Sequence, residues 1–327
     1  MSFERIVGHE AAVRLLKGQI ARDRVAQAYL FTGPEGIGKG ALALEFAKAL
    51  QCEKGKGKGD ACDACEPCKK ITAGVYPDVI TVATPKDKSE IGIDQIRALE
   101  GSLSLTPHGG LCKVGIVDEA ERLTEVSAHG FLKLLEDPPA RSVIILLSTA
   151  PYRLPATVVS RCHVVRCSAQ GIERVAALLR EEAAIGAEAA RTVAIAAGGR
   201  LGLALRFHQS GHLAEKNAAL DQMLTALRQG AVEISLAKTT RRDVEENLEW
   251  YAAWWRDLLV LSLGGDPAWV IHQDRLDVIA NAVKQSPVAP DVLIRRVEQT
   301  YAVQDAVQRN ANLRNAIAVL LSRHGGV

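Results

Sequence analysis

The chain has 327 residues, of which 48% are hydrophobic and 24% are charged, a composition typical of a folded protein with two or three domains. Its 40 basic and 38 acidic residues leave a formal charge of +2, which argues against a protein whose main task is to coat nucleic acid. No apolar run reaches the roughly 18 residues of a membrane span, and the charged N-terminus contains no signal-peptide core. We therefore expect a cytoplasmic protein.

The first half of the chain alternates short β-like runs with helical patterns, which predicts a parallel α/β sheet flanked by helices. Strands are expected at 28–32, 78–84, 112–118, 142–149 and 162–167, with helices at 9–23, 38–51, 92–104 and 124–136. After about residue 168 the pattern becomes helical throughout. Three short Ala- and Leu-rich helices are expected first, and then longer ones near 213–229, 243–263, 273–284 and 290–323.

The stretch GPEGIGKG follows the first predicted strand and opens a predicted helix. Gly33, Gly38 and Lys39 match the phosphate-loop pattern G-x-x-x-x-G-K, and Gly36 and Gly40 complete the candidate cofactor-binding set. Such a loop turns backbone N–H groups toward a phosphate, and its lysine reaches the β- and γ-phosphates. Gly40, however, replaces the Ser or Thr that normally ligates Mg²⁺. The alternative interpretation is a glycine-rich turn without a ligand.

Two carboxylates follow the strand predicted at 112–118. Asp118 could hold Mg²⁺ and Glu119 could polarise an attacking water. Their position about 80 residues after the phosphate loop strengthens this interpretation. The alternative is that both are surface acids at the start of the next helix.

Four of the seven cysteines are spaced C-x9-C-x2-C-x2-C. Because disulfides are rare in cytosolic proteins, we interpret Cys52, Cys62, Cys65 and Cys68 as ligands of one tetrahedral metal, and four thiolates suit structural Zn²⁺. Unrelated free thiols and an iron–sulfur cluster are the alternatives. The remaining three, Cys112, Cys162 and Cys167, flank or lie in apolar strands and are expected in the core.

Taken together, these motifs resemble the AAA+ ATPases of bacterial clamp loaders and, more narrowly, their delta-prime subunits. The resemblance covers essentially the whole chain and rests on the order of seven segments: FERIVGHE (3–10), AQAYLFTGPEGIGKG (26–40), the cysteine insertion (52–68), VDEAERLT (117–124), FLKLLEDPP (131–139), SRC (160–162) and NANLRNAIAVLL (310–321). It implies a P-loop AAA+ domain with the zinc module at 1–167, a three-helix lid at 168–209 and an all-α collar at 210–327.

The resemblance also implies partners and roles. The chain would join delta and the ATP-binding gamma/tau-type subunits in a hetero-pentameric ring of DNA polymerase III, which loads the sliding clamp onto primed DNA. Arg161 of SRC would act as an arginine finger on a neighbour's nucleotide. Three departures concern the chain's own site: Gly40 lacks the hydroxyl, Gly202 stands where active relatives carry a lid arginine, and His129 replaces an asparagine.

We therefore expect little or no ATP hydrolysis by this chain itself. Because Lys39, Asp118 and Glu119 are retained, weak ATP/Mg²⁺ binding is still expected. Two alternatives remain open: an independent AAA+ ATPase motor, and a zinc-dependent DNA-binding module with a vestigial ATPase core. The Lys-rich loop at 54–58 is the one feature that favours DNA binding.

Overall fold

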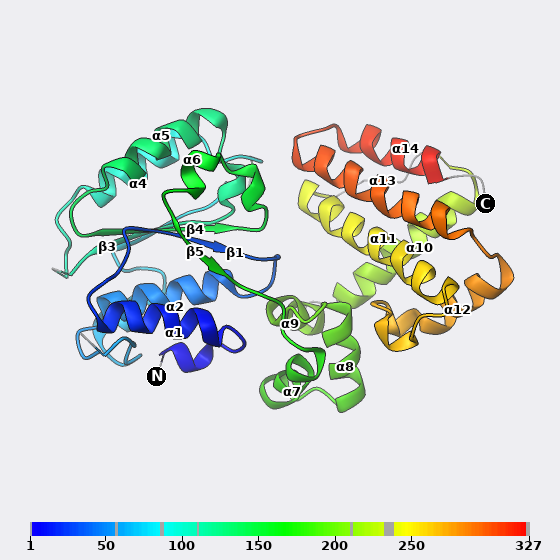
Figure 1. The fold of residues 1–327 in the computed structure, drawn as a ribbon, viewed down its shortest axis with the longest axis horizontal. Helices are drawn as coiled ribbons and strands as arrows, with labels where there is room; N and C mark the ends of the chain where they lie inside the picture. The colour runs from blue at the N-terminus through cyan, green and yellow to red at the C-terminus, as the bar shows by residue number, and fades with distance from the viewer. Residues whose placement is uncertain are drawn as a thin grey trace. The chain divides into compact units, whose positions relative to one another are not determined.

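The computed structural model describes residues 2–55, 58–85, 88–109, 111–209, 212–231 and 239–324. The chain divides into two units, residues 1–170 and 171–327, and each is described by itself (Figure 1). The division into three parts expected from the sequence stays a prediction.

The first unit is built on a five-stranded parallel sheet in the order β2-β3-β4-β1-β5. Its strands are β1 (Ala28–Thr32), β2 (Val79–Val82), β3 (Lys113–Val117), β4 (Ser142–Ser148) and β5 (His163–Arg166). All five predicted strands and the parallel sheet are therefore confirmed. Thr32 pairs with both Ser148 and Arg166, so the carboxyl ends of three strands meet at one edge of the sheet.

Helices cover both faces of this sheet (Figure 1). The side chains of Tyr29 and Phe31 pack on the face covered by α1 (Glu10–Ala21) and α2 (Lys39–Gln51). Alternate residues of the same strands pack on the other face, which is covered by α4 (Ile93–Leu103), α5 (Glu125–Glu136) and α6 (Ala156–Val159). This alternation follows from the two-residue period of a strand. The near-continuous Val, Ile and Leu runs of β3 and β4 are buried at every position, as expected for strands covered on both faces.

Short elements complete the first unit. They are η1 (Ser2–Arg5), α3 (Glu66–Thr72), η2 (Ala120–Arg122) and η3 (Pro151–Arg153). The helix α3 directly follows the cysteine-rich segment and contains the last of its four cysteines.

The second unit is helical throughout its described residues. Its elements are α7 (Ile172–Ala183), α8 (Ala187–Ala196), α9 (Leu201–Gln209), α10 (His212–Arg228), α11 (Arg241–Ser262), η4 (Pro267–Trp269), η5 (Gln273–Arg275), α12 (Leu276–Gln285), α13 (Pro290–Gln308) and α14 (Leu313–His324). The three predicted short helices are confirmed as α7, α8 and α9. One hydrophobic core joins them to the longer helices, with Leu179, Leu203 and Leu248 among its buried residues.

The single helix predicted over 290–323 is wrong, because the chain forms α13 and α14 instead. Asn310 adopts a left-handed backbone conformation with φ of 66°, which ends α13. The Ala311 N–H then donates to the carbonyl of Ala306 at 2.9 Å, and the Asn312 side chain accepts from the N–H of Asn315 at the start of α14. The break was not predicted, because the helical spacing of apolar residues continues across it.

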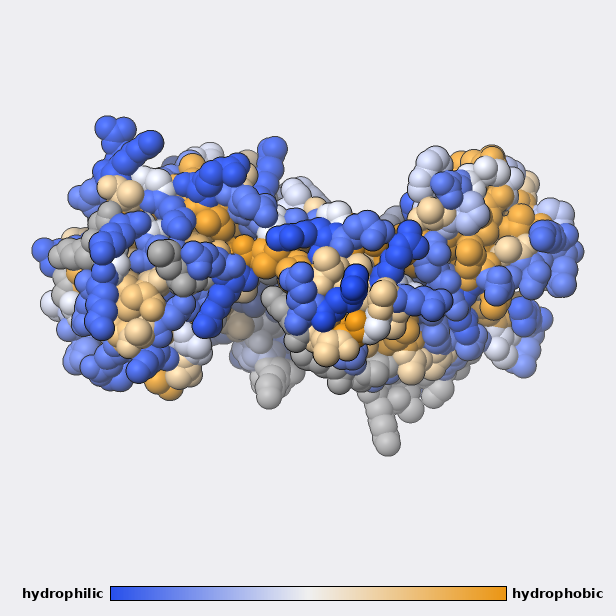
Figure 2. All heavy atoms as spheres, turned by 90° about the horizontal axis from the view of Figure 1, so that it is seen from below, coloured by the Kyte–Doolittle hydropathy of each residue, from blue (hydrophilic) through white to orange (hydrophobic). Residues whose placement is uncertain are grey.

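Hydrophilic side chains cover most of the face seen in Figure 2, and hydrophobic side chains form smaller areas between them. Exposed large hydrophobic residues occur in both units, Tyr152 and Trp269 among them. In the parts of the chain that the structure describes, no helix combines the length and apolar character needed to cross a membrane.

Candidate functional site

The glycine-rich loop lies where β1 ends and α2 begins. Gly33 passes so close to the next strand that a Cβ there would lie 2.2 Å from the carbonyl oxygen of Cys167. Gly38 is the residue before the first turn of α2 and has a φ of 105°, a conformation that other residues adopt only with strain. The sequence therefore uses glycine at these two positions because the turn requires it, and the N-terminus of α2 points into the loop.

Lys39 is buried inside this loop, with 8% of its surface exposed. Its ammonium donates to the carbonyl oxygens of Gly33 at 2.7 Å and of Pro34 at 2.9 Å. Burial lowers the pKa of Lys39, whereas nearby Glu121 opposes this shift. His9, the residue before α1, also contacts the loop. Its Nε2 lies 2.9 Å from the carbonyl oxygen of Ile37. This contact of His9 was not predicted, although His9 belongs to the segment 3–10 that carries the resemblance.

Gly40 is exposed in the first turn of α2. An ideal Cβ at this position would meet no atom closer than the Leu147 Cδ1 at 4.0 Å. The surrounding structure therefore leaves room for a serine or threonine side chain, although Gly40 provides no hydroxyl.

The two predicted acids follow β3, but their carboxylates make different contacts. Asp118 accepts the N–H of Glu119 at 3.0 Å, and burial raises the pKa of the Asp118 carboxyl. Glu119 has a left-handed backbone with φ of 52°, and its carboxylate pairs with Arg122 at 3.5 Å. The charge of Asp118 opposes the lowering of the Lys39 pKa by burial.

Glu121 is a further acid of this turn, and its role was not predicted. It accepts hydrogen bonds from both the backbone N–H and the hydroxyl of Thr149, the residue after β4. Its charge also opposes the lowering of the Lys39 pKa by burial. Glu121 thus joins the ends of β3 and β4 beside the loop lysine. The clustered acids of the segment DEAE were the only sequence signal for it.

Arg161 lies in the turn between α6 and β5, with 38% of its side chain exposed. Its guanidinium donates to the carbonyl oxygen of Thr157 at 2.9 Å and to the carboxylate of Glu136 at 2.8 Å. Arg161 precedes β5, whereas the glycine-rich loop follows the parallel strand β1. Arg161 and the loop therefore lie at opposite ends of two adjacent strands. A strand of four residues is about 13 Å long, and this length separates them.

The four cysteines of the predicted metal site come together. Their sulfur atoms all lie within 4.8 Å of one another, and the sulfurs of Cys52 and Cys65 are 3.9 Å apart. A tetrahedral Zn²⁺ with Zn–S bonds of about 2.3 Å separates its sulfur ligands by about 3.8 Å. The Cys52 sulfur also accepts N–H groups from Gly55 at 3.1 Å and Cys62 at 3.2 Å, which oppose the rise of its pKa that burial causes. The donor set and its spacing fit Zn²⁺.

The cysteines differ in their acidity. Hydrogen bonds from the backbone N–H groups of Ala64 and Cys65 lower the pKa of Cys62 to about 6. Burial raises the pKa of Cys112, Cys162 and Cys167 to about 11 in each case. These three thiols lie outside the cluster, and Cys167 is buried in the core as expected, whereas Cys112 and Cys162 are only partly buried at its edge. Low acidity suits a packing role.

Two acids between the cysteines attach the cluster to the domain. Asp60 accepts the backbone N–H of Phe3 at 3.1 Å and the ammonium of Lys17 at 2.8 Å. Asp63 pairs at 2.8 Å with Lys48, a fully buried lysine of α2. These contacts were not predicted, because an acid in a Lys- and Gly-rich loop has no distinguishing sequence pattern.

The two other residues that differ from the pattern of active relatives, Gly202 and His129, lie on helices. Gly202 is in the first turn of α9, and the nearby Arg200 donates to the Ala197 carbonyl at 2.9 Å and to Glu249 of α11 at 3.3 Å. Arg200 is therefore engaged within the second unit. His129 is exposed on α5, where its Nδ1 contacts the carbonyl of Glu125 at 2.8 Å.

The sheet order, the loop between β1 and α2, and the acidic turn after β3 define the first unit as an AAA+ domain. Residues 8–170 match the family model described as DNA polymerase III, delta subunit. Over 250 residues the chain is 31% identical to the DNA polymerase III subunit delta' of Pseudomonas aeruginosa, and the alignment covers 75% of each chain. The chain belongs to the delta-prime family of DNA polymerase III clamp-loader subunits.

Similarity extends to other subunits and to a branch-migration motor. The DNA polymerase III subunit tau of Bacillus subtilis is 36% identical over 161 residues, which are 49% of this chain but only 28% of that protein. The structure of the RuvB Holliday junction branch migration motor of Thermotoga maritima aligns with a TM-score of 0.46 and 18% identity, covering 93% of this chain and 90% of that one.

Proposed function

We propose that this chain is a member of a clamp-loader ring that supplies Arg161 to the ATP site of a neighbouring subunit. Its own loop contributes little or no hydrolysis. In the assembly with delta and gamma/tau-type subunits, the chain serves the loading of the sliding clamp onto primed DNA. Residues 168–209 act as its lid and residues 210–327 as its collar.

The position of Arg161 is the observation that carries this proposal. Arg161 and the glycine-rich loop lie at opposite ends of two adjacent parallel strands, so the guanidinium cannot serve the chain's own loop. Its side chain is more than one-third exposed, and both of its contacts are made at the surface. Such an arginine can exchange its contact with Glu136 for the γ-phosphate of a neighbour, where it stabilises transition-state charge.

The chain's own loop supports the second half of the proposal. Gly40 provides no hydroxyl for Mg²⁺, and Lys39 donates to the carbonyl oxygens of Gly33 and Pro34. A nucleotide must therefore replace two hydrogen bonds that the lysine already makes. Weak ATP/Mg²⁺ binding, with Asp118 near the metal, is compatible with this arrangement, and rapid hydrolysis is not favoured.

Structural Zn²⁺ completes the proposed set of cofactors. Cys52, Cys62, Cys65 and Cys68 would hold it with four thiolates, and a closed site of this kind supports folding rather than catalysis. Because Cys52 directly follows α2 and Lys39 begins it, the metal would stabilise the helix that carries the loop lysine.

The test is ATP turnover by the reconstituted ring in the presence of clamp and primed DNA. Arg161→Ala is expected to lower turnover at the neighbouring site by at least tenfold. The matched control is Arg174→Ala, which removes an exposed arginine of the second unit and should leave turnover unchanged. Normal turnover by the Arg161→Ala ring would refute the role in trans. Steady hydrolysis by the chain alone, abolished by Lys39→Ala, would instead identify an independent motor.

A further inference from the structure

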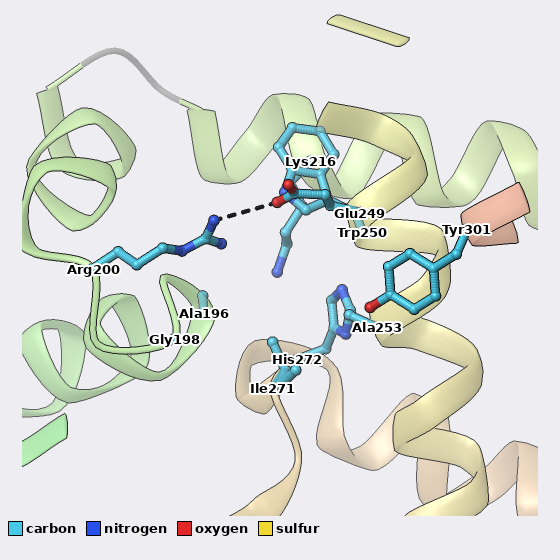
Figure 3. A pocket seen from close by; sticks show the side chains of 10 residues that line it. All are labelled: Ala196, Gly198, Arg200, Lys216, Glu249, Trp250, Ala253, Ile271, His272 and Tyr301. Carbon is cyan, nitrogen blue, oxygen red and sulfur yellow. Dashed lines mark hydrogen bonds and ion pairs between the residues drawn. The ribbon is translucent and has the colours of Figure 1, made fainter. Parts of the chain in front are cut away.

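A pocket of about 280 Å³ lies within the second unit, and its lining includes none of the residues of the glycine-rich loop, the cysteine cluster or Arg161. The turn after α8 forms one side of it, and α10, α11, α13 and the segment before η5 form the others (Figure 3). Its charged and hydrogen-bonding side chains are those of Arg200, Lys216, Glu249, Trp250, His272 and Tyr301.

Two cationic side chains from different elements are directed into this pocket (Figure 3). Lys216 of α10 is 2% exposed, and its ammonium donates to Asp274 at 2.7 Å. Arg200 uses its Nε for the carbonyl of Ala197 and one terminal nitrogen for Glu249 at 3.3 Å. These contacts use one of three donors of the lysine and two of five donors of the arginine, so both cations retain donors for a ligand.

The histidine of the pocket has a fixed orientation. Its Nδ1–H donates to Asp257 at 2.8 Å, and the same carboxylate accepts the N–H of Ile271 at 2.9 Å. Trp254 packs edge-on against the imidazole, with 5.8 Å between ring centroids. In the neutral tautomer this arrangement leaves the other ring nitrogen, Nε2, as a hydrogen-bond acceptor. Burial lowers the pKa of His272, which favours that neutral form.

Two cations beside one fixed acceptor match the chemistry of a monohydrogen phosphate group. Its anionic oxygens accept from ammonium and guanidinium groups, and its P–OH donates to an imidazole nitrogen. Glu249 does not block such a ligand, because its side chain is 42% exposed and can turn to water when Arg200 binds an anion. Tyr301 lies at the rim with its hydroxyl directed toward His272 (Figure 3).

We propose that this pocket binds a small phosphate-bearing anion through Lys216 and Arg200, with the protonated phosphate oxygen donating to His272. The ligand is inorganic phosphate, because its monohydrogen form carries the P–OH group that His272 accepts, whereas a phosphomonoester is mostly dianionic at neutral pH and has none. Because Arg200 precedes α9 and Lys216 lies on α10, the bound anion would join these two parts of the second unit.

The test is equilibrium dialysis of radiolabelled inorganic phosphate against the full chain at constant ionic strength. Every variant also carries Lys39→Ala, so that the glycine-rich loop does not contribute. One phosphate per chain is expected. Arg200→Gln should weaken binding by about tenfold or more, as expected for losing a hydrogen bond to a charged group, and Lys216→Met should abolish it. Lys284→Met, an exposed lysine outside the pocket, is the matched control.

Lys216 is buried, so circular dichroism must show that its variant folds, and the rim variant Arg200→Gln tests the site independently. Sulfate should compete more weakly than phosphate, because it has no protonated oxygen for His272 at neutral pH. Adenosine monophosphate should also compete more weakly than phosphate, because its phosphate group is mostly dianionic at neutral pH and lacks the P–OH. No saturable phosphate, binding that survives both variants, or equal competition by sulfate would overturn the proposal.

Discussion

The guanidinium of Arg161 donates to the carboxylate of Glu136 across 2.8 Å, which joins the turn before β5 to the last residue of α5. Both side chains are more than one-third exposed, at 38% and 55%. Ion pairs of this exposure contribute about 0–1 kcal/mol to stability. Glu136 therefore orients Arg161 at the surface without holding it strongly, and the pair can open when a stronger anion approaches.

Replacing this partner should leave the function of Arg161 intact. Glu136→Gln keeps the shape of the side chain and removes its charge, so less energy is needed to move Arg161 onto a phosphate. We expect turnover by the reconstituted ring to stay equal or rise up to a few fold, and the free energy of unfolding to change by less than about 1 kcal/mol. Glu173→Gln, which removes the partner of Arg191 in another exposed pair, is the control. A loss of turnover as large as that of Arg161→Ala would show that Glu136 itself is required.

Restoring a hydroxyl at position 40 should strengthen nucleotide binding. Gly40→Ser fits because a Cβ has no neighbour within 4.0 Å other than Leu147, and serine is the better helix former by about 0.5 kcal/mol. We expect a small gain in stability and about tenfold tighter ATP binding that depends on Mg²⁺, measured by calorimetry with and without the metal.

A second glycine of the same loop provides the contrast. Gly38→Ser introduces a side chain at a φ of 105° and should cost about 1–2 kcal/mol of stability without improving binding. Equal ATP affinity of Gly40→Ser and the natural chain, with and without Mg²⁺, would mean that the missing hydroxyl does not limit binding.

Removing the metal should weaken the first unit. The four thiols lie within 4.8 Å of one another, and Asp60 and Asp63 join their loop to Lys17 and Lys48. We expect one Zn²⁺ per chain by elemental analysis. Chelation or Cys68→Ser should cost about 2–3 kcal/mol and lower the melting temperature by about 5–10 °C. The control is Cys162→Ser, which should retain the zinc because Cys162 lies outside the cluster. A full complement of zinc in Cys68→Ser would contradict the assignment.

The second unit should lose stability in acid because of His324. This histidine is 1% exposed, and burial together with Arg296 and Arg323 lowers its pKa to about 4. Between pH 6.5 and 4 the unfolded chain therefore binds a proton that the folded chain does not, so the free energy of unfolding falls as the pH falls. The difference amounts to about 3 kcal/mol for about 2.5 pH units.

Urea unfolding at several pH values measures this effect. His324→Leu should flatten the acid limb of the stability profile, whereas the exposed His208→Leu should leave it unchanged. If the natural chain and His324→Leu lose stability equally between pH 6.5 and 4, His324 does not carry the proton linkage.

Most of the fold could be predicted because its signals are local. Strands buried on both faces read as continuous Val, Ile and Leu runs, and the loop of Gly33 and Gly38 marks the turn between β1 and α2. The break at Asn310 could not be predicted, because the apolar period of α13 continues through it into α14. One residue in a left-handed conformation was enough to divide the expected helix.

The site was predictable to the extent that its residues follow spaced motifs. The four cysteines come together as their spacing indicated. The contacts of Glu121 with Thr149 and of Lys48 with Asp63 were not predictable, because each joins segments that only the folded sheet and helices bring together. The same holds for Arg161, whose position opposite the loop depends on the parallel pairing of β1 with β5.

The most direct test of the account compares Arg161→Ala with Lys39→Ala in the same reconstituted ring, measuring ATP turnover stimulated by clamp and primed DNA. If the chain acts mainly on its neighbour's nucleotide, Arg161→Ala lowers turnover at that site by at least tenfold, a conservative figure for an arginine finger. Lys39→Ala should leave turnover within about twofold, because the chain's own loop contributes little. Loss of turnover with Lys39→Ala and normal turnover with Arg161→Ala would contradict the account.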